Sequence, residues 1–186
     1  MSALRLLLAL VLLAQPVAGQ GCPPAELDVA READLIDALR AAPDAGAARA
    51  YNARLWELWT DAPDAHAQSL LDSGMARLRM GDVGKALKAF DALIAYCPDY
   101  AEGYNQRAFA RYLRQEFGPA LADLDAALAR SPRHIGALSG KALTLMGLGR
   151  DRSALEALEA ALALNPWLSE RALLPVLKQR LGDEEL

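Results

Sequence analysis

The sequence predicts an all-α protein made of stacked helical hairpins, and three observations support this. Pro98, Pro132 and Pro166 stand 34 residues apart. An alanine followed four positions later by an apolar residue precedes each proline at the same distance: Ala86 and Phe90, Ala120 and Leu124, Ala154 and Leu158. This period and pattern are typical of helix-turn-helix repeats. Such repeats bury their apolar faces against one another, so we expect a binding surface rather than a reaction centre.

Phasing the chain on these prolines divides residues 64–166 into three repeats, which span 65–98, 99–132 and 133–166. Apolar periodicity places a pair of helices in each repeat. The expected pairs are Ala67–Met80 with Val83–Tyr96, Tyr100–Gln115 with Phe117–Ala129, and Ile135–Leu148 with Arg152–Ala163. Small residues recur where the helices of a pair must approach closely: Gly74 and Ala86, Ala108 and Ala120, Ala142 and Ala154. A bulky residue there would cost about 1–3 kcal/mol by overpacking.

The segments that flank the repeats are expected to cap the array. Residues 20–63 are predicted to form an arm and a helical hairpin, with helices at Ala25–Ala41 and Ala47–Thr60. We expect Trp56 and Trp59 of this hairpin to pack against the first repeat. Residues 167–186 are predicted to form a capping helix and a frayed tail, with Ser169 as N-cap and a kink or break at Pro175.

Residues 1–19 have the layout of a secretory signal peptide. Arg5 precedes an apolar stretch over residues 6–13, and the small residues Val17, Ala18 and Gly19 mark a cleavage site. We therefore expect an exported protein, in the periplasm, without an integral membrane segment after cleavage. An uncleaved membrane anchor is the alternative.

Cys22 and Cys97 are the two cysteines of the chain. In an oxidising compartment they are candidates for a disulfide, which would enclose about 76 residues and stabilise the fold by roughly 4.5 kcal/mol. The alternative is two unpaired thiols, with Cys97 as a small buried residue. A lipid anchor on Cys22 is a further alternative, although Gly19-Gln20-Gly21 fits a lipidation signal poorly.

The composition gives no sign of a catalytic, metal or cofactor site. The formal charge is −4, or −5 once Arg5 is removed with the signal peptide, and this argues against a nucleic-acid partner. His66 and His134 are interpreted as solvated turn residues, and neither has a second metal-ligand type four residues away. We therefore expect no enzyme activity, no metal and no cofactor.

The repeats resemble the tetratricopeptide repeat family. The matching residues are Gly74, Gly81, Ala86, Phe90 and Pro98 in the first repeat, Tyr104, Ala108, Tyr112, Phe117, Ala120 and Pro132 in the second, and Ala142, Gly149, Ala154, Ala161 and Pro166 in the third. The resemblance implies an α-solenoid, right-handed in this family, with the N-terminal hairpin and the capping helix at its ends. It also implies an adaptor or assembly factor that binds a peptide or protein.

In this family the first helix of each repeat lines a concave groove. The resemblance therefore implies a partner-binding groove formed by Leu71, Met75, Asn105, Gln106, Phe109, Tyr112, Ser139, Leu143 and Met146. Leu71 and Met75 stand where family members that grip a terminal carboxylate have lysine and asparagine, so a carboxylate clamp is not expected.

Two alternatives remain open at this level. The apolar groove residues are either accessible to a partner, or part of the core and covered. In the second case the chain would be a structural or self-associating subunit, a possible homo-oligomer, that uses Trp56, Trp59 and Trp167 on its capping helices.

Overall fold

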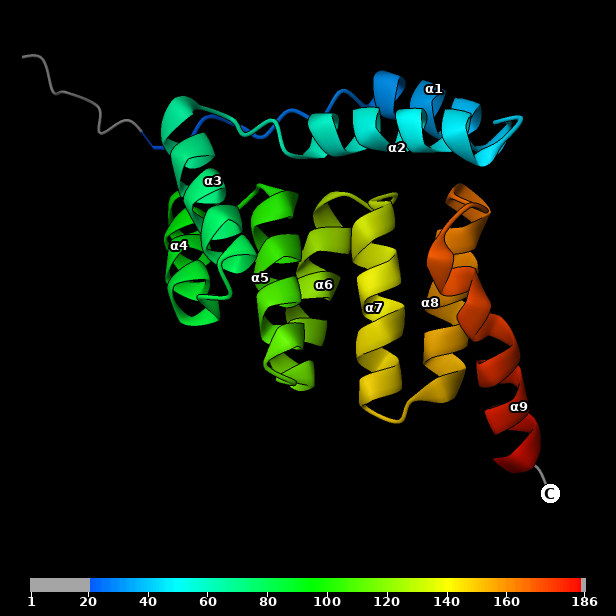
Figure 1. Ribbon diagram of the computed structural model, residues 1–186. Coiled ribbons are helices and arrows are strands. Elements are labelled where there is room, and N and C mark those ends of the chain that lie inside the picture. The colour runs from blue at the N-terminus through cyan, green and yellow to red at the C-terminus, as the bar shows by residue number, and fades with distance from the viewer. Residues whose placement is uncertain (1–20, 185–186) are drawn as a thin grey trace, which may run out of the picture.

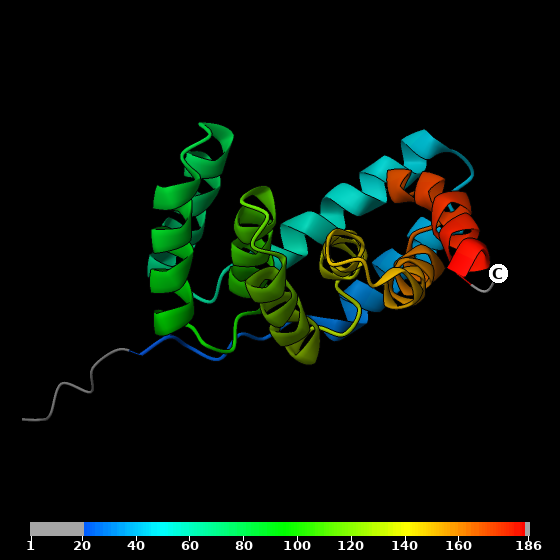
Figure 2. The same cartoon turned by 90° about the horizontal axis from the view of Figure 1, so that it is seen from below.

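The computed structural model describes residues 21–184, so the expected signal peptide and the last two residues lie outside the described part. The repeats contain six helices, whose bounds lie within two residues of those predicted: α3 (Ala65–Arg79), α4 (Val83–Tyr96), α5 (Ala101–Leu113), α6 (Phe117–Arg130), α7 (Ile135–Gly147) and α8 (Asp151–Leu164). Consecutive helices pack as antiparallel neighbours and form a solenoid (Figures 1 and 2). The predicted all-α repeat architecture is confirmed.

The turn inside each repeat contains one residue in the left-handed backbone region. These residues are Gly81, Gln115 and Gly149, with φ angles of 76°, 59° and 68°. They are spaced by the same 34 residues as the prolines. Gln115 has a side chain where the other two repeats have glycine, and this conformation costs such a residue about 1–2 kcal/mol. The geometry of the repeat therefore overrides the local preference of Gln115.

The two helices of the first repeat approach most closely at Gly74. A Cβ atom at this position would lie 2.6 Å from Cζ and 2.7 Å from Cδ1 of Phe90, which is fully buried. No side chain larger than hydrogen fits there unless the Phe90 ring moves. A close approach of α3 and α4 is therefore present at Gly74, although the contact given by its position is with Phe90 rather than with Ala86.

The sequence suggested that the N-terminal hairpin caps the first repeat, but the structure places it elsewhere. Its helices, α1 (Val29–Arg40) and α2 (Ala45–Trp59), lie instead across the edge of the array where α5 and α7 begin and α6 and α8 end (Figure 1). Residues 21–28 form an extended arm rather than the first turns of a helix, and α1 begins after its N-cap Asp28. We call α1 and α2 together the strap.

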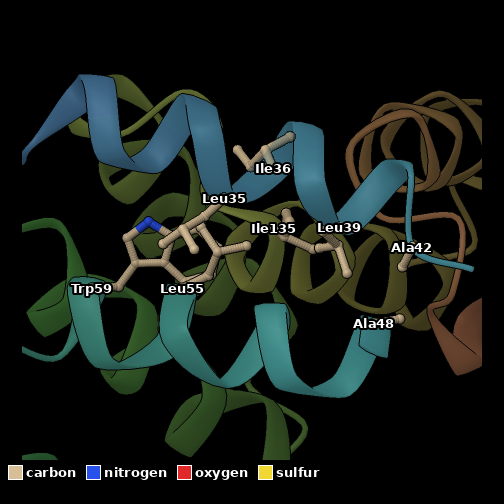
Figure 3. Packing of buried hydrophobic residues seen from close by; sticks show 8 residues of the cluster. All are labelled: Leu35, Ile36, Leu39, Ala42, Ala48, Leu55, Trp59 and Ile135. Atoms are coloured by element: carbon tan, nitrogen blue, oxygen red, sulfur yellow. The ribbon is translucent and has the colours of Figure 1, made fainter. Parts of the chain in front are cut away.

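The strap buries an apolar stripe against the array. Leu35, Leu39 and Leu55 pack with Ile135, the first residue of α7 (Figure 3). Trp59 belongs to this cluster and is only 4% exposed. Trp56 and Trp59 therefore pack near the start of the third repeat, and the expectation that they pack against the first repeat is wrong.

Polar contacts and a disulfide link the strap and arm to the turns that end the first and third repeats. Tyr100 donates its hydroxyl hydrogen to the carbonyl oxygen of Trp59 at 2.8 Å, and the amide of Asn165 donates to Asn52 at 3.4 Å. A disulfide joins Cys22 of the arm to Cys97, with the Cα atoms 5.1 Å apart. Cys97 and Asn165 occupy equivalent positions, each just before the closing proline of its repeat.

The C-terminal segment covers the last repeat. A 3₁₀-helix, η1 (Ser169–Leu173), leads into α9 (Leu174–Glu184), which packs on α8 and buries Leu177. Pro175 is the second residue of α9, so the expected break falls just before it, where its missing N–H costs nothing. The prediction that Ser169 is an N-cap is wrong. Ser169 is the first residue of η1, and its hydroxyl bonds the Glu170 side chain.

Within residues 21–184, no helix combines the length and the apolar character that crossing a bilayer requires.

Substitution of Gly74 by alanine should destabilise the fold. The added methyl group overlaps the Phe90 ring, so we expect Gly74→Ala to lower the free energy of unfolding by about 1–3 kcal/mol. Gly84→Ala is the matched control, because Gly84 is also helical and a Cβ atom there meets nothing within 4 Å. Urea denaturation of both variants measures the difference. Equal stabilities would contradict the packing at Gly74.

Candidate functional site

A pocket of about 320 Å³ lies between α5, α7 and the strap, and we call it the groove pocket. Its lining is Trp56, Asn105, Gln106, Ala108, Phe109, Tyr112, Leu124, Gly136, Ser139, Gly140, Leu143, Thr144 and Glu170. Most of these side chains are apolar or uncharged. A volume of this size fits one or two side chains of a bound peptide or a small ligand.

Six residues of the predicted groove meet in this pocket. They are Asn105, Gln106, Phe109, Tyr112, Ser139 and Leu143. They come from the first helices of the second and third repeats, which the fold places side by side. Phe109 is the most accessible of the large apolar residues among them, with 51% of its surface exposed.

Three other predicted groove residues do not line this pocket. Leu71 is fully buried among the side chains of the first repeat, including Phe90. Met75 packs against the same cluster, and Met146 packs against the core between α7 and α8. Leu71 is therefore not a groove residue, which corrects what the family resemblance implied, and Met75 and Met146 lie outside the lining of the groove pocket.

The strap forms one wall of the groove pocket, which sequence reasoning missed. Trp56 from α2 lies on Gly136 of α7, where a Cβ atom would stand 3.1 Å from Cη2 of the indole. Glu170 of η1 completes the lining and is its one charged residue. Trp56 is 80 residues before Gly136 in the chain, so no local pattern links the two.

A buried carboxylate holds two polar side chains of the groove pocket. Glu102, 1% exposed, accepts hydrogen bonds from the amide of Asn105 at 3.1 Å and from that of Gln106 at 2.6 Å. His134 lies with Nε2 2.8 Å from the same carboxylate. Both groove amides are therefore held in a defined orientation by a residue that the sequence analysis did not select.

His134 is fully buried, which corrects its interpretation as a solvated turn residue. Its Nδ1 accepts a hydrogen bond from the backbone N–H of Ala137 and so caps α7. Its ring stacks on Trp59, with the ring centroids 4.2 Å apart. Trp59 in turn donates its indole N–H to Glu32 of α1 at 3.0 Å. Hydrogen bonds and one ring stack thus join Glu32 of the strap to Glu102, which holds the groove amides.

The arginines of α5 point away from the groove pocket. Arg107 and Arg111 both bind the buried carboxylate of Asp123 on α6, and Arg107 also reaches Asp91 on α4. Its hydrogen bonds to Asp123 raise the pKa of Arg107 above its usual range. These arginines therefore face neighbouring helices, and the groove pocket has no basic residue in its lining.

The tryptophans considered for self-association are mostly used inside the molecule. Trp59 is buried and Trp56 is partly buried in the strap, whereas Trp167 is 38% exposed. Over residues 21–184, no group of three or more histidine, cysteine, aspartate or glutamate residues is placed to hold a metal ion.

Comparison with known proteins finds similar repeats in one curated protein and in several solved structures. No family model matches the chain. A TPR repeat-containing protein of Rhizobium etli is 33% identical over 108 residues, which are 58% of this chain and 53% of that protein. The match thus spans about half the length of this curated relative.

Solved structures of tetratricopeptide repeat (TPR) domains superpose on the repeats. The first TPR domain of Spaghetti, bound to an HSP90 peptide, matches with a TM-score of 0.62 at 22% identity and covers 64% of this chain and 96% of that one. The TPR2B domain of yeast Sti1, in a complex with pHsp70, matches with a TM-score of 0.58 at 26% identity and covers 65% and 99%. MamA from RS-1, a double mutant, matches with a TM-score of 0.59 at 20% identity and covers 84% and 85%.

The repeated helical pairs, their 34-residue period and these similarities lead to one assignment. The chain has the fold and the 34-residue repeat pattern of tetratricopeptide repeat proteins.

Proposed function

We propose that this protein is a scaffold that binds a peptide or protein partner through the groove pocket. The observation that carries the proposal is the exposed Phe109 at a pocket with a largely apolar lining. An exposed aromatic ring beside a concave apolar surface is typical of a contact that dominates binding. Tyr112 and Leu143 extend the apolar lining on both sides.

The polar groups of the pocket suit the main chain of an extended peptide. Glu102 holds the amide groups of Asn105 and Gln106 through their nitrogen atoms, and each amide retains a carbonyl oxygen as an acceptor. Ser139 adds a hydroxyl from α7. Apolar walls with a few oriented polar groups are the usual composition of a ligand pocket.

The partner that we propose does not bind through a negatively charged terminal carboxylate. Two of the similar TPR domains are described with HSP90 and pHsp70 partners, which supports peptide binding by this fold. In this chain, however, Leu71 is in the core, and Glu170 is the one charged residue that lines the groove pocket. We therefore propose an apolar anchor in an uncharged or basic segment of the partner.

We further propose that the protein acts outside the cytoplasm, in the periplasm, as an adaptor or assembly factor. The signal-peptide pattern of residues 1–19 supports export. The disulfide between Cys22 and Cys97 is consistent with an oxidising compartment.

Phe109→Ala should abolish capture of the partner from an envelope extract by the tagged, purified protein. Truncation of a central aromatic contact typically costs about 2 kcal/mol or more, which is roughly a thirtyfold loss of affinity. Combination with Tyr112→Ala should deepen the loss. Mass spectrometry of the captured proteins provides the measurement.

Leu113→Ala is the matched control for this experiment. Leu113 lies one turn further along α5 and is 49% exposed, close to the 51% of Phe109, but it does not line the groove pocket. The control should retain the partner. A partner recovered equally with Phe109→Ala and with Leu113→Ala would exclude the groove as its binding site.

Export predicts a processed and oxidised chain. N-terminal sequencing of protein recovered from the periplasm should begin near Gln20, and both cysteines should resist alkylation until a reductant is added. An intact Met1 terminus, or thiols that react without reduction, would contradict the proposed compartment.

A further inference from the structure

A second pocket, of about 430 Å³, has Glu102 in its lining, whereas Asn105 and Gln106, which Glu102 bonds, line the groove pocket. Its outer wall is the arm, over residues 23–27, and its inner wall comes from the end of α2 and the start of α5. We call it the arm pocket. The two pockets share no lining residue, so the arm pocket is a site separate from the proposed peptide groove.

The arm pocket contains a buried carboxylate without a cationic partner in the described part of the chain. Glu102 receives hydrogen bonds from two neutral amides and from His134. Because Nδ1 of His134 accepts from the Ala137 N–H, the nitrogen that faces Glu102 as a donor is Nε2. A buried charge is costly unless an opposite charge balances it. A cation in the pocket would supply that balance.

Other groups around the pocket are also negative. Glu26, Asp61 and Asp99 are exposed residues of its lining. Burial, followed by the charges of Glu102 and Asp61, raises the pKa of the Tyr100 phenol above its usual range. A concave site lined by charges of one sign concentrates ions of the opposite sign.

The one basic residue in the lining is directed elsewhere. Arg130 donates hydrogen bonds to the carbonyl oxygens of Pro98 and Ala126 and to the hydroxyl of Tyr104. Its guanidinium also lies over the Tyr104 ring, 4.3 Å from the centroid. These contacts occupy its charged group, so Arg130 does not balance Glu102.

A hydroxyl in the lining has no partner among the residues that the structure describes. Ser131 is 4% exposed, and its Oγ atom makes no hydrogen bond there. Buried polar atoms are rarely left unpaired, because an unmade hydrogen bond costs about 1–3 kcal/mol. A ligand that donates hydrogen bonds would satisfy this oxygen.

We propose that the arm pocket binds a small organic cation with a primary ammonium or guanidinium group. The ligand would donate to Ser131 and to Oε1 of Glu102, which accepts one hydrogen bond within the described residues. Trp59 and Tyr100 provide aromatic walls, and such walls attract cations. The disulfide at Cys22 holds the arm against the array and so keeps the outer wall in place.

Calorimetric titration of the oxidised protein with cadaverine, a linear diamine, tests the proposal. Pentanediol, of the same length but uncharged, is the control ligand. Cadaverine should bind saturably and pentanediol should not. Asp61→Asn and Ser131→Ala should each weaken cadaverine binding, on the order of fivefold, because each removes one attractive group. Phe109→Ala should leave the affinity unchanged.

Asp37→Asn is the matched control variant, since Asp37 is an exposed acid of α1 outside the arm pocket. It removes the same charge as Asp61→Asn and should not alter the affinity. Absence of saturable cadaverine binding, or equal binding of pentanediol, would overturn the proposal. It would also fail if Asp37→Asn weakened binding as much as Asp61→Asn, because the attraction would then come from the net charge alone.

Discussion

The docking of the strap on the turns between repeats is the contact on which the rest of the structure depends. In a solenoid each repeat normally contacts only its neighbours, so stability is close to a sum of local terms. Here α1 and α2 place one apolar cluster, with Ile135 at its centre, over the edge of the array. Cys22 anchors the arm to the first repeat and Asn52 reaches the turn after the third. Distant repeats are thereby tied together.

The strap also shapes both pockets. Trp56 forms a wall of the groove pocket, while the neighbouring Trp59 lines the arm pocket and stacks on His134. Glu102 lines the arm pocket and bonds the amides of the groove pocket. Movement of the strap would therefore change both pockets at once, because their walls belong to the same short helix.

The charged residues that join the helices lie apart from those that line the two pockets. Arg107, Arg111 and Asp123 join α5 to α6 through buried ion pairs, on the side of α5 away from the groove pocket. Apart from Glu170, the groove pocket is lined by uncharged side chains, whereas several acidic residues line the arm pocket. One array thus presents an apolar site and a negative site, which suit ligands of different chemistry.

The sequence by itself determined the repeat architecture, because the 34-residue period and the small residues that allow close helix packing are local and repeated. The resemblance of the repeats to a known family also implied six of the groove residues, among them Phe109 and Asn105. The same resemblance could not separate Leu71, which is core, from those accessible residues. The tertiary structure alone decided the position of the strap, the burial of His134 and the wall formed by Trp56. These features depend on contacts between segments far apart in the chain, which no local pattern encodes.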